Sequence, residues 1–173
     1  IALDSGETPL LCLVEHLQGK RSFSRLCRTF VRDGGKVVLV DGAGEGSVAP
    51  ADTGIPDYEG LPLSRYISLC EMANPMHRLW SDGRWNKMAL SHGCYWRKCT
   101  FCDTSLDYIR RFGTSPADRL VDRIAAVAAK TGSRGFHFVD EATPPALLEK
   151  VAQRLIRRGV GIEWWTNIRF ERQ

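Results

Sequence analysis

Three cysteines stand close together past the middle of the chain, and cysteines at such spacing bind metals or carry out redox chemistry. Cys94, Cys99 and Cys102 fall within nine consecutive residues. Thiolates are the forms that bind iron and zinc, and the neighbouring cations Arg97 and Lys98 favour deprotonated sulfurs. Because the chain shows no secretory signal, the three cysteines indicate a metal or redox site rather than a disulfide framework.

The spacing leaves the identity of the metal open. A 4Fe–4S cluster held by only three cysteines has one iron open to a further ligand, which is a catalytic arrangement. A structural zinc takes four protein ligands, and His92 could complete a Cys3His set in a non-catalytic zinc-stapled scaffold or interaction module. His92 lies beside Cys94 on the same turn, where closing a tetrahedron is awkward, so the spacing favours iron. Two further alternatives remain: the thiols only pack, and His92 is a hydrogen-bonded residue at a strand end.

The other three of the six cysteines have a different setting. Cys12, Cys27 and Cys70 each stand alone among apolar neighbours. Isolated thiols in such surroundings behave as small buried apolar side chains. We therefore expect them in the packing core and not at the metal site.

The segment after Trp85 alternates strand and helix patterns. Residues 87–91, 135–139 and 162–166 are predicted strands. One predicted helix is capped by Thr114 or Ser115 with Pro116 as its first residue, and another follows Pro144 and Pro145 and ends at Gly159. This alternation predicts βαβ crossovers and a parallel sheet, with the three cysteines beyond the C-terminal end of the first strand, where α/β proteins place their sites.

The N-terminal part is predicted to be a helix, a hairpin and a linker. Leu10, Leu13, Val14 and Leu17 form the apolar face of an amphipathic helix that ends at Gly19. Residues 29–32 and 36–40 flank Asp33-Gly34-Gly35, a sequence typical of a β-hairpin turn. A stretch rich in Gly, Pro and Ser follows to about residue 62, and the aromatic segment up to Trp85 is expected to wrap over the next domain.

Composition excludes several classes of protein. The 173 residues carry a net charge of +4 from 24 Lys and Arg against 20 Asp and Glu, and the cations are scattered, so nucleic-acid binding is unsupported. No stretch approaches the roughly 18 consecutive apolar residues that a membrane span needs. We expect a cytoplasmic protein without a membrane partner. The start at Ile1, without an initiator Met, suggests a piece of a longer protein.

The cysteine segment resembles a known motif. A strand followed by Gly93-Cys94 and a closing Cys99-Thr100-Phe101-Cys102 resembles the cluster motif of radical S-adenosylmethionine (SAM) enzymes. The four residues between Cys94 and Cys99 are one more than the commonest family spacing, and this variant is similar to a subgroup that carries an N-terminal cobalamin-binding domain. The helix, hairpin and linker upstream resemble the region that follows that domain.

The resemblance implies a fold and a domain organisation. The expected fold class is α/β, an incomplete parallel (β/α) barrel of the radical SAM type preceded by a helix, a β-hairpin and a linker. Residues 1–48 would be the C-terminal tail of an upstream cobalamin-binding-like domain, 49–84 a linker and wrapping segment, and 85–173 the N-terminal part of the barrel. Since the family barrel has more strands than this chain supplies, we expect an open sheet edge through which the piece could dimerise.

The resemblance also implies cofactors and roles. Cys94, Cys99 and Cys102 would hold three irons of a 4Fe–4S cluster, and SAM would chelate the fourth. An electron from a donor such as flavodoxin or ferredoxin would then cleave SAM to a 5′-deoxyadenosyl radical that attacks a small-molecule substrate. Cobalamin-dependent methyl transfer is expected if the full-length protein binds cobalamin, and the piece alone is expected to be inactive.

Five further residues are implied as SAM contacts. Phe101 would line the adenine pocket, and the acidic pair that follows the second strand would engage the SAM amino group. A simpler interpretation of that pair is as acidic residues at the start of the following helix. The acidic pair is Asp140 and Glu141. Two polar residues after the third strand, Asn167 and Arg169, would reach the ribose or the carboxylate of SAM.

Overall fold

The computed structural model describes residues 1–3, 5–66 and 85–170 and divides the chain into two compact units. The first unit comprises Ile1–Asp52 and the second Thr53–Gln173. The boundary between them falls inside the predicted linker. Most of the predicted wrapping segment, with Cys70, lies outside the described residues.

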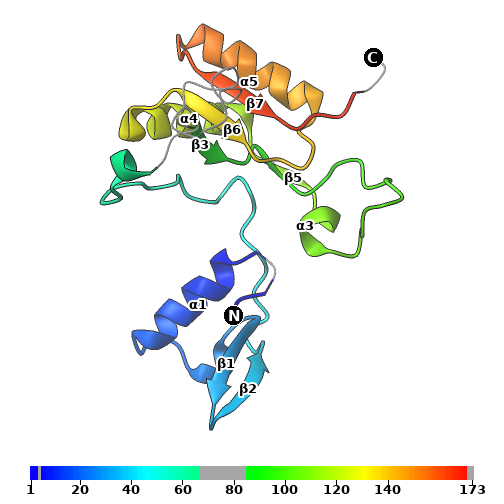
Figure 1. Ribbon diagram of the computed structural model, residues 1–173. Helices are drawn as coiled ribbons and strands as arrows, with labels where there is room; N and C mark the ends of the chain where they lie inside the picture. Colours follow the sequence, from blue (N-terminus) through cyan, green and yellow to red (C-terminus); the bar gives the residue numbers. More distant parts are fainter. Residues whose placement is uncertain (4, 67–84, 171–173) are drawn as a thin grey trace. The chain divides into compact units, whose positions relative to one another are not determined.

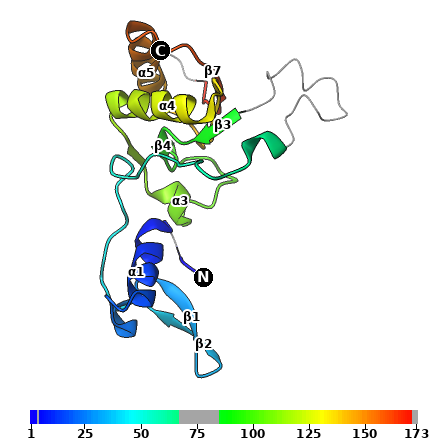
Figure 2. The same cartoon turned by 90° about the vertical axis from the view of Figure 1, so that its left-hand side faces the viewer.

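The first unit consists of a helix beside a hairpin (Figure 2). Helix α1 (Glu7–Leu17) is followed by the short 3-10 helix η1 (Phe23–Arg25) and by strands β1 (Thr29–Asp33) and β2 (Lys36–Val40), which pair antiparallel. Gly34 and Gly35 have φ of 52° and 81°, the left-handed backbone that a tight turn requires. The predicted hairpin is confirmed, with its turn at the predicted residues.

Helix α1 forms where its apolar periodicity predicts it, but it buries a different face. Leu10 and Leu17 are 59% and 77% exposed, whereas Cys12 is fully buried. The core of this unit is made of Cys12, Leu26 and Cys27, with Leu13, Val31, Val40 and Ala43 packed against it. The prediction that Leu10 and Leu17 belong to the buried face of the helix was therefore wrong. The segment around Leu26 packs against the side of α1 that carries Cys12.

The second unit is built on a three-stranded parallel sheet (Figure 1). Its strands are β3 (Trp85–Met88), β6 (Gly135–Phe138) and β7 (Glu163–Thr166), in the order β3-β6-β7, and the register pairs Lys87 with His137 and His137 with Trp165. Helix α4 (Ala117–Thr131) connects β3 to β6, and α5 (Pro145–Arg157) connects β6 to β7. The predicted βαβ crossovers and parallel sheet are confirmed.

One core joins the sheet to both helices. Phe136 and Phe138 of the central strand are buried together with Leu120 and Ile124 of α4 and Val151 of α5. Helix α4 begins one residue later than predicted, because Pro116 occupies the cap position instead of the first turn, and no side chain caps it. It ends at Gly132, whose φ of 69° allows the left-handed C-cap.

The described strands do not close a barrel. Among residues 85–170, β3 and β7 pair in the sheet only with β6, so the part of the chain described here is an open mixed α/β fold with one parallel sheet. A 3-10 helix, η2 (Leu63–Arg65), is the remaining element upstream of β3 within residues 53–66. No helix within the described ranges is both long enough and apolar enough to cross a membrane.

Candidate functional site

The candidate site is the loop that leaves the C-terminal end of β3. After β3 the chain forms β4 (Ser91–His92), then the cysteine loop (residues 93–112), and returns through β5 (Gly113–Thr114), which pairs antiparallel with β4. The loop contains the short helix α3 (Asp107–Arg110) and appears in green beside the sheet in Figure 1. Cys94 N–H donates to the Ile109 carbonyl at 3.4 Å, so the loop also closes on itself.

The root of the loop is held by a buried carboxylate. Asp140, which follows β6 and is 2% exposed, accepts hydrogen bonds from Leu90 N–H at 3.0 Å and Ser91 N–H at 2.6 Å. The Ser91 hydroxyl donates a third at 2.5 Å. These contacts explain why the first strand ends at Met88 and not at residue 91 as predicted, because the backbone amides of Leu90 and Ser91 donate to Asp140 and not to a neighbouring strand.

The sulfur of Cys102 lies within electrostatic range of the sulfurs of Cys94 and Cys99. Cys94, Cys99 and Cys102 are all partly exposed free thiols, and Cys102 N–H donates to the Cys99 carbonyl at 3.3 Å. Partial burial raises the pKa of the Cys102 thiol, and the neighbouring sulfurs of Cys99 and Cys94 and the carboxylate of Glu141 raise it further. The fold therefore brings together the three predicted ligands and one predicted SAM contact.

The described side chains do not form a preassembled metal site. Within the described ranges, no three His, Cys, Asp or Glu side chains are arranged to hold a metal ion. The donor set is nevertheless suited to iron–sulfur chemistry, since such clusters are held by Cys thiolates and these three are reachable from solvent on one loop. His92 beside them has a buried Nε2 without a hydrogen-bond partner among the described residues.

The remaining predicted SAM contacts have different surroundings. Phe101 is 88% exposed on the loop, and Glu141 is exposed in the segment that follows β6. The side-chain Nδ2 of Asn167 donates to the backbone carbonyl of Asp140 at 3.2 Å. The backbone carbonyl of Asn167 accepts from Thr143 N–H at 3.0 Å. The side chains of Asp140 and Asn167 thus connect the ends of neighbouring strands to one another.

Arg169 contacts a residue that sequence reasoning did not single out. Its guanidinium carbon lies 3.2 Å from the ring centroid of Trp96, and Lys98 Nζ lies 5.0 Å from the same ring. Trp96 is one of the four residues between Cys94 and Cys99. The position of Trp96 between two predicted metal ligands could have drawn attention to it, but nothing in the sequence identifies Arg169 as its partner.

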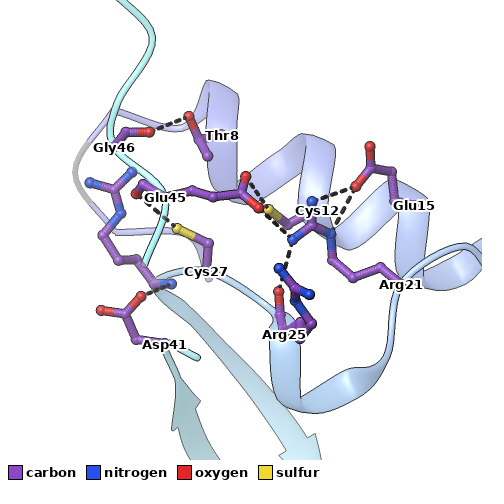
Figure 3. Close-up of polar contacts among 10 residues, drawn as sticks. Thr8, Cys12, Glu15, Arg21, Arg25, Cys27, Asp41, Glu45 and Gly46 are labelled. Atoms are coloured by element: carbon purple, nitrogen blue, oxygen red, sulfur yellow. Dashed lines mark hydrogen bonds and ion pairs between the residues drawn. The ribbon is translucent and has the colours of Figure 1, made fainter. Parts of the chain in front are cut away.

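The two described isolated cysteines lie in the first unit, where they pack as predicted. Figure 3 shows Glu45 between them: Cys12 Sγ donates to its Oε2 and Cys27 Sγ to its backbone carbonyl, both at 3.6 Å. Arg21 binds the other carboxylate oxygen at 2.7 Å and also pairs with Glu15. Burial, followed by the Glu45 charge, raises the pKa of Cys12, which disfavours the reactive thiolate.

Comparison with known proteins adds no further information. No family model matches the chain, and neither a curated protein nor a solved structure gives a significant match.

Proposed function

We propose that Cys94, Cys99 and Cys102 hold a 4Fe–4S cluster and that the chain is part of a radical SAM enzyme. The observation that carries the proposal is the presence of three solvent-reachable thiols on one loop beyond the C-terminal edge of a parallel sheet, with Cys94 and Cys99 near enough to Cys102 to raise its pKa. In α/β proteins this edge is where ligands bind, because loops from several strands meet there. The resemblance of the cysteine segment to the family motif agrees with that placement.

The protein supplies the ligands and the surface around them. Three thiolates leave one iron available for an outside ligand, and Glu141, close enough to Cys102 to raise its pKa, offers an exposed carboxylate to an ammonium group bound there. Phe101 offers an exposed ring on which an adenine can stack. When bound, the cluster and SAM supply one-electron cleavage chemistry. The same proposal includes a small-molecule substrate for the enzyme, an electron donor that reduces the cluster, and cobalamin if a longer form of the protein binds it.

A zinc site is the second candidate, and one observation favours it. The Nε2 atom of His92 is buried and has no hydrogen-bond partner in the described part of the chain, so a metal could bind it. His92 precedes Cys94 by two residues, so two ligands of a Cys3His set would come from the same turn. This arrangement would staple the loop and have no catalytic role.

Metal analysis of anaerobically prepared protein tests the proposal. We expect a brown protein with about four irons per chain. Cys94→Ala, Cys99→Ala and Cys102→Ala should each prevent stable loading, because two thiolates cannot hold three irons. Cys12→Ala and Cys27→Ala are matched controls, since both residues are buried in the other unit, and should keep the iron. A colourless protein with one zinc, or equal iron loss in both sets of variants, would contradict the proposal.

A further inference from the structure

The contact between Arg169 and Trp96 joins two distant parts of the second unit. Arg169 follows β7, whereas Trp96 lies in the cysteine loop that follows β3, and these strands are at opposite edges of the sheet. Both side chains are partly buried. The guanidinium carbon is 3.2 Å from the ring centroid, a stacked arrangement that suits a planar and weakly hydrated cation.

The loop segment that this contact holds is strained. Arg97 has a φ of 51°. Residues other than glycine rarely adopt this left-handed backbone conformation, and they keep it only when the surrounding structure enforces it. One restraint is the hydrogen bond from Arg97 Nη1 to the Arg110 carbonyl at 2.6 Å, which ties the segment to α3. The stack of Arg169 on Trp96 is a second restraint on the adjacent residue, and it comes from outside the loop.

We infer that Arg169 is a positioning residue for the cysteine loop and that it acts through Trp96. The stack fixes the residues between Cys94 and Cys99, and so sets where the first sulfur lies relative to the other two. Its contribution to cluster binding rests on the proposed function, but the restraint on the loop does not. Arg169 thereby serves the protein's own loop, a role different from the SAM contact that the family resemblance implies.

The restraint is tested first in the metal-free intact protein by amide hydrogen exchange. In Arg169→Ala and Trp96→Ala, peptides covering residues 94–102 should exchange faster by about fivefold, and the double variant by no more than either single one. Trp96→Phe keeps an aromatic face and should restore most of the protection. Arg157→Ala, at an exposed position in the last turn of α5, is the matched control and should leave the loop unchanged.

The consequence for the cluster is tested by iron release to a chelator after anaerobic reconstitution. Arg169→Ala should bind iron but release it several-fold faster than the parent and the Arg157→Ala control. Unchanged exchange in residues 94–102, or equal acceleration across α4, α5 and the sheet, would overturn the positioning role. If the parent binds no iron, the proposed function fails while the exchange experiment still decides the role of Arg169.

Discussion

Replacement of Asp140 is the most direct test of how the sheet holds the cysteine loop. Its carboxylate is 2% exposed and accepts three hydrogen bonds, two from the backbone amides of Leu90 and Ser91 and one from the Ser91 hydroxyl. Asp140→Ala removes every acceptor and leaves two N–H groups without partners inside the protein. The hydroxyl can rotate to find another acceptor, whereas the two amides cannot.

The expected cost follows from the two amides. A buried donor that loses its partner costs about 1–3 kcal/mol, so the loss of two such partners in Asp140→Ala should lower the free energy of unfolding by about 2–6 kcal/mol. Asp140→Asn keeps the shape and one acceptor oxygen but directs an NH2 group at a donor, and should cost about 2 kcal/mol. Since domains of this size are stable by about 5–15 kcal/mol, both losses are measurable and neither has to abolish folding.

Urea unfolding followed by tryptophan fluorescence gives these values, and amide exchange of Leu90 and Ser91 localises them. Asp118→Ala is the matched control, because that carboxylate pairs with Arg154 on the surface and is 69% exposed. The control should change stability little, since exposed ion pairs are screened by solvent. The reasoning is refuted if Asp140→Ala shifts the unfolding midpoint no further than Asp118→Ala does.

Two further predictions concern the first unit. Gly42→Ala should destabilise it by about 1–3 kcal/mol in thermal unfolding, because a Cβ there would lie 1.9 Å from the Ser24 carbonyl oxygen, whereas Gly46→Ala meets no atom within 4 Å and should be neutral. The Arg21 guanidinium holds the pKa of Glu45 below its ordinary value of 4.5, so the unfolded state binds more protons than the folded state in acid and the stabilisation falls as the pH drops below 4.5. Glu45→Gln should flatten this acid-side dependence in urea unfolding; an identical slope in the variant would show that Glu45 does not cause it.

Local patterns predicted much of the architecture because the chemistry that sets them is local. The hairpin around Gly34 and Gly35 depends on backbone conformations that these two residues adopt, and it is found where predicted. The crossover helices depend on apolar periodicity, and α5 forms in the predicted segment, although it starts at Pro145 itself and not after the two prolines. The position of the cysteine loop beyond the first parallel strand follows from the same alternation of strands and helices.

The roles of particular residues were less predictable. Asp140 after a strand has the same sequence signature whether its carboxylate binds a ligand or holds the backbone, and its three protein donors appear only once β6 lies beside β3. Leu10 and Leu17 satisfy helical periodicity yet are exposed, because periodicity reports that a helix has an apolar face and not what packs against it.

The sequence by itself determined the identity and spacing of the three thiols, the hairpin and the strand–helix alternation, since each depends on residues within a few positions of one another. Only the tertiary structure decided that Glu45 accepts from Cys12, that Asp140 ends the first strand, and that Arg169 stacks on Trp96. These contacts join residues that are distant in the chain. Their geometry exists only after strands and helices have packed, so no local pattern carries it.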